Sequence, residues 1–255
     1  MSQTFLPKIL QEKAIEVADL ALETVGEGRK SYRLFDYLKA QKDRLQVIAE
    51  VKKASPSMGD INLDVDIIQQ AKTYEANGAC MISVLTDRLF FKGDLSYLRE
   101  VSKAVSVPTL AKDFIIDEKQ IVRSFNAGAT VILLIVAALT QDRLKELFDF
   151  ATGLGLEVLV ETHTAEELAI AHRIGAEIIG VNNRNLTTFD VSLEHTKAMA
   201  PLFEADRVYV SESGIFSSHD AHQVAPYVSA ILVGTALMQS TDVASTIKEL
   251  QVDKS

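Results

Sequence analysis

The chain has 255 residues, of which 47% are hydrophobic and 24% are charged, and its net charge is −9 at pH 7. A disordered chain has fewer hydrophobic residues, and a nucleic-acid-binding protein carries a concentrated excess of basic ones. The longest apolar stretch, residues 131–139, is about half the length that crosses a bilayer. These values predict a folded protein that binds neither nucleic acid nor membrane.

The N-terminal 45 residues have the apolar spacing of amphipathic helices. The positions that carry this pattern are Ile9, Ala14, Val17, Leu20, Ala21, Leu34, Phe35 and Leu38. Lys and Glu are interspersed among them, so the segment lacks the apolar core of a signal peptide. The single cysteine, Cys80, lies in an apolar run and has no partner for an internal disulfide. We therefore expect a cytoplasmic protein whose first 45 residues pack as extra helices on the fold that follows.

From Val47 onward, eight short runs rich in Val, Ile and Leu alternate with longer amphipathic stretches, a pattern typical of βαβ units. The predicted strands are residues 47–51, 81–85, 109–111, 131–134, 157–160, 178–181, 208–210 and 230–233. Helix caps are predicted at Asp64, Asp117, Thr140 and Thr164, the last with Glu167 in a capping box.

Eight repeats of one strand–helix unit without a linker favour a closed barrel over a doubly wound sheet. The one glycine pair that resembles a dinucleotide fingerprint, Gly153 and Gly155, precedes a strand, whereas that fingerprint follows one. The sequence thus predicts an α/β fold with a single (β/α)8 TIM barrel over residues 1–255, in which residues 1–45 form the helical extension.

Active sites of such barrels lie at the C-terminal ends of the strands. Alternation along the first strand places Glu50 and Lys52 on the lumen face and Ala49 and Val51 on the helix face. The same reasoning directs Lys112, Glu161, Asn182 and Arg184 into the lumen. Because buried charge is costly without good pairing, this convergence points to a catalytic site. We expect the pKa values of its lysines to be tuned toward the working pH.

Glycines after the last two predicted strands indicate a phosphate site. Ser213 and Gly214 follow the seventh strand, Gly234 and Thr235 follow the eighth, and Ser55 lies in the first loop. Glycine lets backbone N–H groups approach an anion closely. A single such glycine is usually a turn, but the pair in these two positions predicts a bound phosphate group.

Two other possibilities, a metal site and a nucleophilic triad, have weaker support in the sequence. His219 and His222 are spaced like metal ligands, but no third ligand accompanies them, so a solvated helix face is the favoured interpretation. No Ser or Cys stands beside a His and an orienting acid, which leaves a nucleophilic triad without support. We expect no metal and no cofactor.

Eight segments resemble the indole-3-glycerol-phosphate synthase family in sequence and in order. They are IAEVKKASPSMGDI (48–61), SVLTDRLFFKGDLSYL (83–98), LAKDFIID (110–117), VILLIVAAL (131–139), LVETHTAEEL (159–168), GVNNRNL (180–186), VSESGI (210–215) and LVGTALM (232–238). The resemblance runs from about Val47 to the end of the chain. One departure is Met58, where the family often has Lys.

The resemblance implies ring closure of 1-(2-carboxyphenylamino)-1-deoxyribulose 5-phosphate, with loss of CO2 and water, in tryptophan biosynthesis. It assigns Lys112 as general acid, Glu161 as its acid–base partner in dehydration, and Glu50 as the carboxylate that orients Lys112. Lys52 is similar to the residue that binds the departing carboxylate. The catalytic set it implies is Glu50, Lys52, Lys112, Glu161, Asn182 and Ser213. The residues it implies for substrate and phosphate binding are Ser55, Phe91, Phe114, Arg184, Glu212, Gly214, Gly234 and Thr235.

Three alternatives remain open on sequence alone. A Schiff-base aldolase also uses a barrel lysine and a phosphate site, with Lys112 as nucleophile. Phosphoribosylanthranilate isomerase shares the fold but does not explain two lysines and two glutamates in one lumen. A non-catalytic ligand-binding barrel requires a replaced catalytic position, and none is replaced. We expect one small phosphorylated substrate as partner, and a monomer or weak homodimer.

Overall fold

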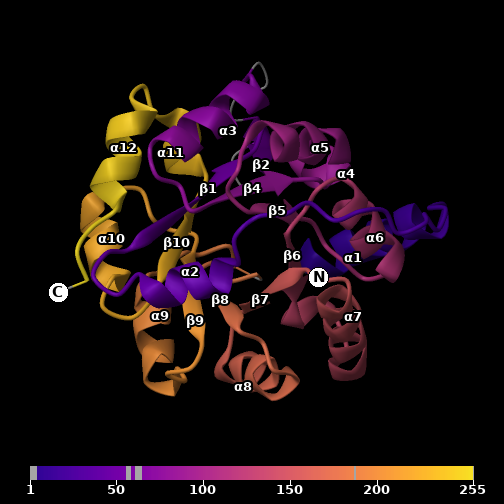
Figure 1. Ribbon diagram of the computed structural model, residues 1–255. Helices are drawn as coiled ribbons and strands as arrows, with labels where there is room; N and C mark the ends of the chain where they lie inside the picture. The colour runs from indigo at the N-terminus through magenta and orange to yellow at the C-terminus, as the bar shows by residue number, and fades with distance from the viewer. Residues whose placement is uncertain (1–4, 56–58, 61–64, 187, 255) are drawn as a thin grey trace.

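The computed structural model describes residues 5–55, 59–60, 65–186 and 188–254. Eight parallel strands close into a barrel in the order β1-β10-β9-β8-β7-β6-β5-β4 (Figure 1). The strands are β1 (Gln46–Val51), β4 (Met81–Leu85), β5 (Thr109–Lys112), β6 (Val131–Ile135), β7 (Glu157–Thr162), β8 (Ile178–Asn182), β9 (Val208–Glu212) and β10 (Ala230–Val233). The prediction of a (β/α)8 TIM barrel is confirmed, because each predicted run is a strand of this sheet.

Several strands extend one or two residues past their predicted ends. Lys112, Asn182 and Glu212 are each the last residue of a strand, where the apolar pattern has already stopped. Hydrogen bonding of the parallel ladder, which is independent of side-chain polarity, continues the strand through them. A short hairpin of β2 (Ala54–Ser55) and β3 (Gly59–Asp60) was not predicted, since two-residue strands have no measurable period.

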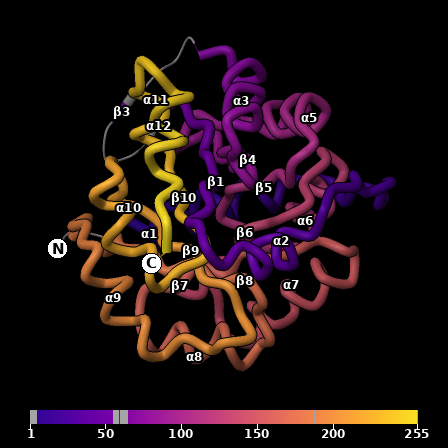
Figure 2. The backbone as a smooth tube through the Cα atoms, turned by 60° about the vertical axis from the view of Figure 1, so that its left-hand side comes forward, coloured from indigo at the N-terminus to yellow at the C-terminus, as the bar shows by residue number. Residues whose placement is uncertain are grey.

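Helices surround the barrel (Figure 1). They are α3 (Ile67–Ala76), α4 (Arg88–Phe91), α5 (Leu95–Ala104), α6 (Glu118–Asn126), α7 (Gln141–Gly153), α8 (Ala165–Ile174), α9 (Glu194–Met199), α10 (Ser218–Val224), α11 (Thr235–Gln239) and α12 (Val243–Leu250), with 3-10 turns η1 (Val136–Ala138) and η2 (Ala200–Leu202). Figure 2 shows α12 beside α3, so the ring of helices closes where the barrel closes. No helix in the described ranges is long and apolar enough to cross a bilayer.

The predicted caps Asp117, Thr140 and Thr164 each accept a hydrogen bond from the first turn of their helix. Helix α3 is instead capped by Asp66, which accepts from the N–H groups of Ile68 and Gln69 at 3.0 and 2.9 Å. The predicted cap Asp64 lies outside the described residues. Either aspartate fits a cap before an apolar run, and the sequence pattern did not distinguish them.

The buried apolar residues form two separate clusters, as alternation along the strands requires. Ile48, Leu110 and Leu159 belong to the cluster inside the lumen. Ala49 and Val51 belong to the cluster between the strands and the outer helices. The predicted assignment of faces in the first strand is therefore confirmed, and it directs Glu50 into the lumen.

The two N-terminal helices pack at opposite ends of the barrel. Helix α2 (Leu34–Ala40) places Leu34 and Leu38 in the lumen cluster, and Figure 1 shows it across the end that faces the viewer. Helix α1 (Phe5–Ala18) instead contributes residues to the pocket at the C-terminal ends of the strands. It ends at Ala18, so Leu20 and Ala21, which we expected in this helix, lie beyond it.

Candidate active site

One pocket at the C-terminal ends of the strands brings together most of the predicted site residues. Glu50 comes from β1, Lys112 from the end of β5 and Glu161 from β7. The predicted residues that line the pocket are Glu50, Lys52, Phe91, Lys112, Phe114, Glu161, Asn182, Arg184, Ser213, Gly214, Gly234 and Thr235. Residues far apart in the chain thus meet because parallel strands present their carboxyl ends on one side.

Glu50 is the carboxylate that joins the two lysines. Lys52 Nζ lies 3.0 Å from Glu50 Oε1, and Lys112 Nζ lies 3.3 Å from Glu50 Oε2. Burial opposes ionisation, but the two ammonium groups hold the pKa of Glu50 at about 2. Gly234 leaves the space for this arrangement, because a Cβ there would lie 2.5 Å from Glu50 Oε1. The carboxylate is therefore ionised throughout the neutral range.

Lys112 has a second ion-pair partner, Glu212, at the end of β9. The distance from Lys112 Nζ to Glu212 Oε2 is 3.1 Å, and the Glu212 side chain is 1% exposed. Burial lowers the pKa of Lys112, but Glu212, Glu50 and Glu161 together raise it above its ordinary value. This is opposite to the expected tuning toward the working pH, because three carboxylates outweigh one desolvation penalty. Lys112 therefore holds its proton firmly at neutral pH.

Glu212, which the resemblance implies for substrate and phosphate binding, is not among the described residues that line this pocket. It is buried beneath Lys112, and Gly180 on β8 leaves room for it, since a Cβ at Gly180 would collide with Glu212 Oε1. Burial raises the pKa of Glu212, and the charges of Glu161 and Glu50 act in the same direction. The carboxyl group is thus the weakest acid of the three in the cluster, although Lys112 opposes the shift.

Glu161 is held by two neighbours. Asn182 Nδ2 donates to Glu161 Oε1 at 3.1 Å, and His163 Nε2 lies 3.2 Å from the same oxygen. The other ring nitrogen of His163, Nδ1, lies 3.4 Å from Glu167 Oε2. Burial opposes both shifts, but the pairing lowers the pKa of Glu161 and raises that of His163 to about 10. His163 thus connects the buried carboxylate to Glu167 on the outer helix α8.

His163 was not predicted, although the signal was available. It stands two residues after Glu161, so alternation places both on the same face of the strand end. Glu167 was predicted to complete a capping box with Thr164. Its backbone N–H does donate to Thr164 Oγ1, but its carboxylate accepts from the backbone N–H of His163 at 2.7 Å. The cap therefore also fixes the loop that carries His163.

The turn after β9 is held in a strained conformation by a buried amide. Ser213 has a φ of 66° and is followed by Gly214 at 84°. Asn183 Nδ2 donates to the Ser213 carbonyl at 3.0 Å, and its Oδ1 accepts from both the backbone N–H and the hydroxyl of Thr196. Left-handed backbone in a serine persists only when neighbours impose it. Asn183 was not predicted, because its role depends on the neighbouring strand.

The phosphate candidates Gly234 and Thr235 lie next to this turn, because β10 is the neighbour of β9 in the barrel. Gly234 and Thr235 line the pocket where β10 ends and α11 begins. The side chain of Ser55 lies outside the described parts of the chain, as does Met58. The rim that the structure describes is thus formed by the turns after β9 and β10.

Aromatic side chains form one wall of the pocket. The ring centroids of Phe91 and Phe114 are 6.1 Å apart, and both residues line the cavity. Phe5 from α1 adds an unpredicted ring, which packs edge-on against Phe189 at 5.3 Å. Arg184 completes this side, with its backbone N–H bonded to Asn182 Oδ1 at 3.0 Å. A planar apolar group fits such a wall, with the charged cluster beside it.

Residues 6–250 match the family model of indole-3-glycerol phosphate synthase. Indole-3-glycerol phosphate synthases of Streptococcus pneumoniae strains CGSP14 and JJA are 68% and 67% identical over 254 residues, covering 100% of both chains in each comparison.

Two solved structures share the barrel. The tryptophan synthase alpha chain of Legionella pneumophila subsp. pneumophila superposes with a TM-score of 0.63 at 13% identity, covering 86% of this chain and 96% of that one. The 3-hexulose-6-phosphate synthase of Salmonella typhimurium gives 0.62 at 14%, covering 81% and 96%. At such identities the likeness shows the fold alone. The full-length sequence matches decide the family: the chain belongs to the indole-3-glycerol phosphate synthases.

Proposed function

We propose that the chain acts as a carboxy-lyase on 1-(2-carboxyphenylamino)-1-deoxyribulose 5-phosphate and releases indole-3-glycerol phosphate, CO2 and water. The observation that supports this most is the cluster of Lys52, Lys112, Glu50 and Glu161 in one pocket, with an aromatic wall on one side. The reaction needs proton donors, a proton acceptor, a cation for the carboxylate and space for a benzene ring. Each requirement has a residue of suitable chemistry.

In the first step a carbon–carbon bond forms between the ring carbon that bears the carboxylate and the ketone carbon of the sugar chain. The electron pair of the carbonyl moves to its oxygen, which takes a proton from Lys112. The raised pKa of Lys112 ensures that the proton is present at neutral pH. Glu50 orients this ammonium group and stabilises the positive charge that develops on the substrate nitrogen.

In the second step the bond to the carboxylate carbon breaks and its electron pair restores the aromatic ring. Lys52 binds this carboxylate before it leaves as CO2. In the third step the new hydroxyl group takes a proton from Lys112 or Lys52 and leaves as water, while Glu161 accepts a proton from the carbon next to nitrogen. Two protons are supplied and one is recovered, so each turnover consumes one proton from solvent.

The phosphate group is assigned to the turns after β9 and β10, which contain Gly214, Gly234 and Thr235. Its binding positions the reacting carbons, so that binding energy remote from the chemistry accelerates ring closure. We further propose a cytoplasmic enzyme that acts on this small substrate without a macromolecular partner, as a monomer or weak homodimer. Glu212 acts through Lys112 in this scheme and does not contact phosphate.

The Schiff-base alternative is disfavoured by the electrostatics of Lys112. An amine nucleophile must be unprotonated, but Glu212 and Glu50 lie 3.1 and 3.3 Å from this ammonium group and raise its pKa. The same contacts suit an acid that keeps its proton until the substrate carbonyl accepts it.

The test follows the fluorescence of indole-3-glycerol phosphate after the substrate is added to the purified protein. Wild type should produce it, and Lys112→Ala should lose on the order of 100-fold or more of kcat, the usual scale for a general acid. Lys103→Ala, which removes an exposed lysine paired with Glu100, is the control and should keep full activity. Circular dichroism checks that each variant is folded.

Two outcomes would contradict the proposal. Wild type that forms no indole product overturns the function. A folded Lys112→Ala variant within tenfold of wild type overturns the role of this lysine. Borohydride added during turnover should leave Lys112 unmodified, and a covalent adduct there identifies the Schiff-base mechanism instead.

A further inference from the structure

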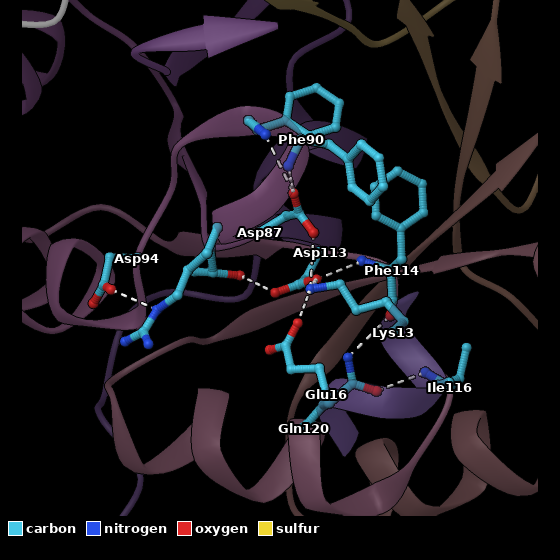
Figure 3. Close-up of polar contacts among 12 residues, drawn as sticks. Lys13, Glu16, Asp87, Phe90, Asp94, Asp113, Phe114, Ile116 and Gln120 are labelled. Carbon is cyan, nitrogen blue, oxygen red and sulfur yellow. Dashed lines mark hydrogen bonds and ion pairs between the residues drawn. The ribbon is translucent and has the colours of Figure 1, made fainter. Parts of the chain in front are cut away.

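A lysine from the N-terminal helix α1 is buried among carboxylates next to the active-site pocket (Figure 3). The Lys13 side chain is 2% exposed, and its Nζ lies 2.8 Å from Asp87 Oδ2 and 2.9 Å from Asp113 Oδ1. Glu16, one turn further along α1, adds a third oxygen at 2.7 Å. Burying a lysine so completely is costly, so its three partners must be strongly compensating.

The first partner, Asp87, holds the short helix that carries the aromatic wall. Asp87 is the N-cap of α4, and its Oδ1 accepts from the backbone N–H groups of Phe90 and Phe91 at 2.7 and 3.2 Å. Lys13 contacts the other carboxylate oxygen. One aspartate therefore connects α1 to the backbone of Phe91, which lines the pocket.

The second partner, Asp113, directly follows the catalytic Lys112. Its Oδ1 accepts from the backbone N–H of Phe114 at 2.8 Å, and its Oδ2 accepts from the Thr86 hydroxyl at 2.7 Å. Burial raises the pKa of this carboxyl above its ordinary value, and Lys13 and Thr86 oppose the shift. Lys13 thus also connects α1 to the end of β5, between the general acid and the second ring of the wall.

The same face of α1 reaches the pocket itself. Ile9 lies one helical turn before Lys13 and Phe5 two turns before it, so the three side chains share one side of the helix. Ile9 is buried and, like Phe5, lines the pocket. The ion pairs that hold Lys13 in place therefore also hold Phe5 and Ile9 at the pocket.

We propose that Lys13 is a positioning residue of the active site, whose ion pairs hold α1, α4 and the end of β5 together as the wall that encloses the aromatic ring of the substrate. This rests on the proposed function, because the wall matters only if an aromatic substrate binds there. Lys13 takes no part in proton transfer. Its loss loosens the wall around the ring, while the phosphate rim on β9 and β10 keeps its own contacts.

The test compares Lys13→Met with Lys8→Met, the same substitution at an exposed position of the same helix. Lys13→Met should raise KM for the substrate about tenfold or more and lower kcat less, whereas Lys8→Met should leave both unchanged. Competitive inhibition by inorganic phosphate, which probes the rim alone, should have the same inhibition constant in all folded variants. A general loss of structure should raise both KM and the inhibition constant of phosphate. Measuring the two constants together therefore distinguishes a positioning role from general destabilisation.

Lys13→Met leaves two buried carboxylates with less compensation and can fail to fold. The double variant Lys13→Met with Asp87→Asn removes one charge of each sign and keeps a good capping side chain, so it decides the question in that case. Its KM should remain raised, because α1 is still released. A folded single or double variant with the KM of wild type overturns the proposal. If the wild-type protein forms no product, the proposed function is overturned. That result is distinct from a Lys13 variant whose KM is unchanged.

Discussion

The ammonium group of Lys112 lies 3.1 Å from a carboxylate oxygen of Glu212, whose side chain is almost completely buried beneath it. Glu50 contacts the same ammonium group from β1 at 3.3 Å. Lys112, the proposed general acid, is therefore held from two strands, and the direction of its ammonium group is fixed by these ion pairs. Such preorganisation removes the need to reorient charge during the reaction.

Replacing Glu212 with glutamine tests this relationship. Because the Glu212 charge raises the pKa of Lys112, the variant should have a lower Lys112 pKa, and the alkaline limb of its kcat profile should move to lower pH. The lysine also loses one restraint, and a shift of about 1 Å can cost about 100-fold in kcat. The pH dependence of kcat measures both effects. An unchanged profile means that Glu212 does not control the acid.

The carboxyl of Glu212 also predicts a pH effect on stability. Its pKa is raised on folding, so the folded protein binds more protons than the unfolded chain as pH rises from the ordinary value of 4.5. The free energy of unfolding of wild type should therefore fall with rising pH relative to that of Glu212→Gln. Urea titrations of both proteins between pH 4.5 and neutrality measure the difference. A difference that grows in the other direction contradicts this assignment.

The space that Gly180 leaves for Glu212 can be tested with a matched pair of alanine substitutions. A Cβ at Gly180 collides with Glu212, so Gly180→Ala should displace the glutamate and lower kcat about tenfold or more while the strand remains formed. Gly153 has nothing within 4 Å of an added Cβ, and Gly153→Ala should leave kcat unchanged. Steady-state fluorescence assays compare the two, and equal kcat values show that the space beside Gly180 has no catalytic importance.

His163 predicts a stability contribution that is lost at high pH. Its pKa is raised from 6.5 to about 10 because Glu161 and Glu167 face it, with the ring of His195 also nearby. A raised histidine pKa stabilises the fold fully below about 6.5, and this contribution disappears as pH rises through about 10. The stability difference between wild type and His163→Asn should therefore shrink across this window by about 1 kcal/mol or more. Unfolding free energies measured at intervals of one pH unit check this, and a constant difference means that His163 is neutral in the fold.

Asn183 predicts a coupled loss of stability and substrate affinity. Asn183→Leu leaves the Ser213 carbonyl and the Thr196 N–H without their partner, which should cost about 2 to 4 kcal/mol of unfolding free energy. The turn at Ser213 should then relax from its strained φ, raising KM for the phosphorylated substrate. Thr196→Val removes only the hydroxyl and should cost less. Denaturant titration and KM measurements test the order, and a more harmful Thr196→Val contradicts it.

The chain itself determined the barrel and the direction of its key side chains. Eight apolar runs with period-two alternation are local signals, and the alternation places Glu50 and Lys52 on the lumen side without knowledge of neighbouring strands. The same local reasoning identified the caps Asp117, Thr140 and Thr164. Gly214 and Gly234 could also be identified from the sequence as candidates for the pocket rim, because each is a glycine that follows a predicted strand.

Only the tertiary structure decided which charged groups are partners. Glu212 lies 100 residues after Lys112, and whether it faces the mouth or the lysine depends on the stagger of the strands around the closed barrel. The apolar spacing of an amphipathic helix shows that one face is buried, but it does not show which part of the protein covers that face. The position of α1 beside the pocket therefore did not follow from the sequence. Neither did the pairing of Lys13 with Asp87 and Asp113. The sequence alone gave the wrong direction for the pKa shift of Lys112, because it did not show that three carboxylates lie near this lysine. Coulombic effects depend on distances between groups that only the folded chain brings together.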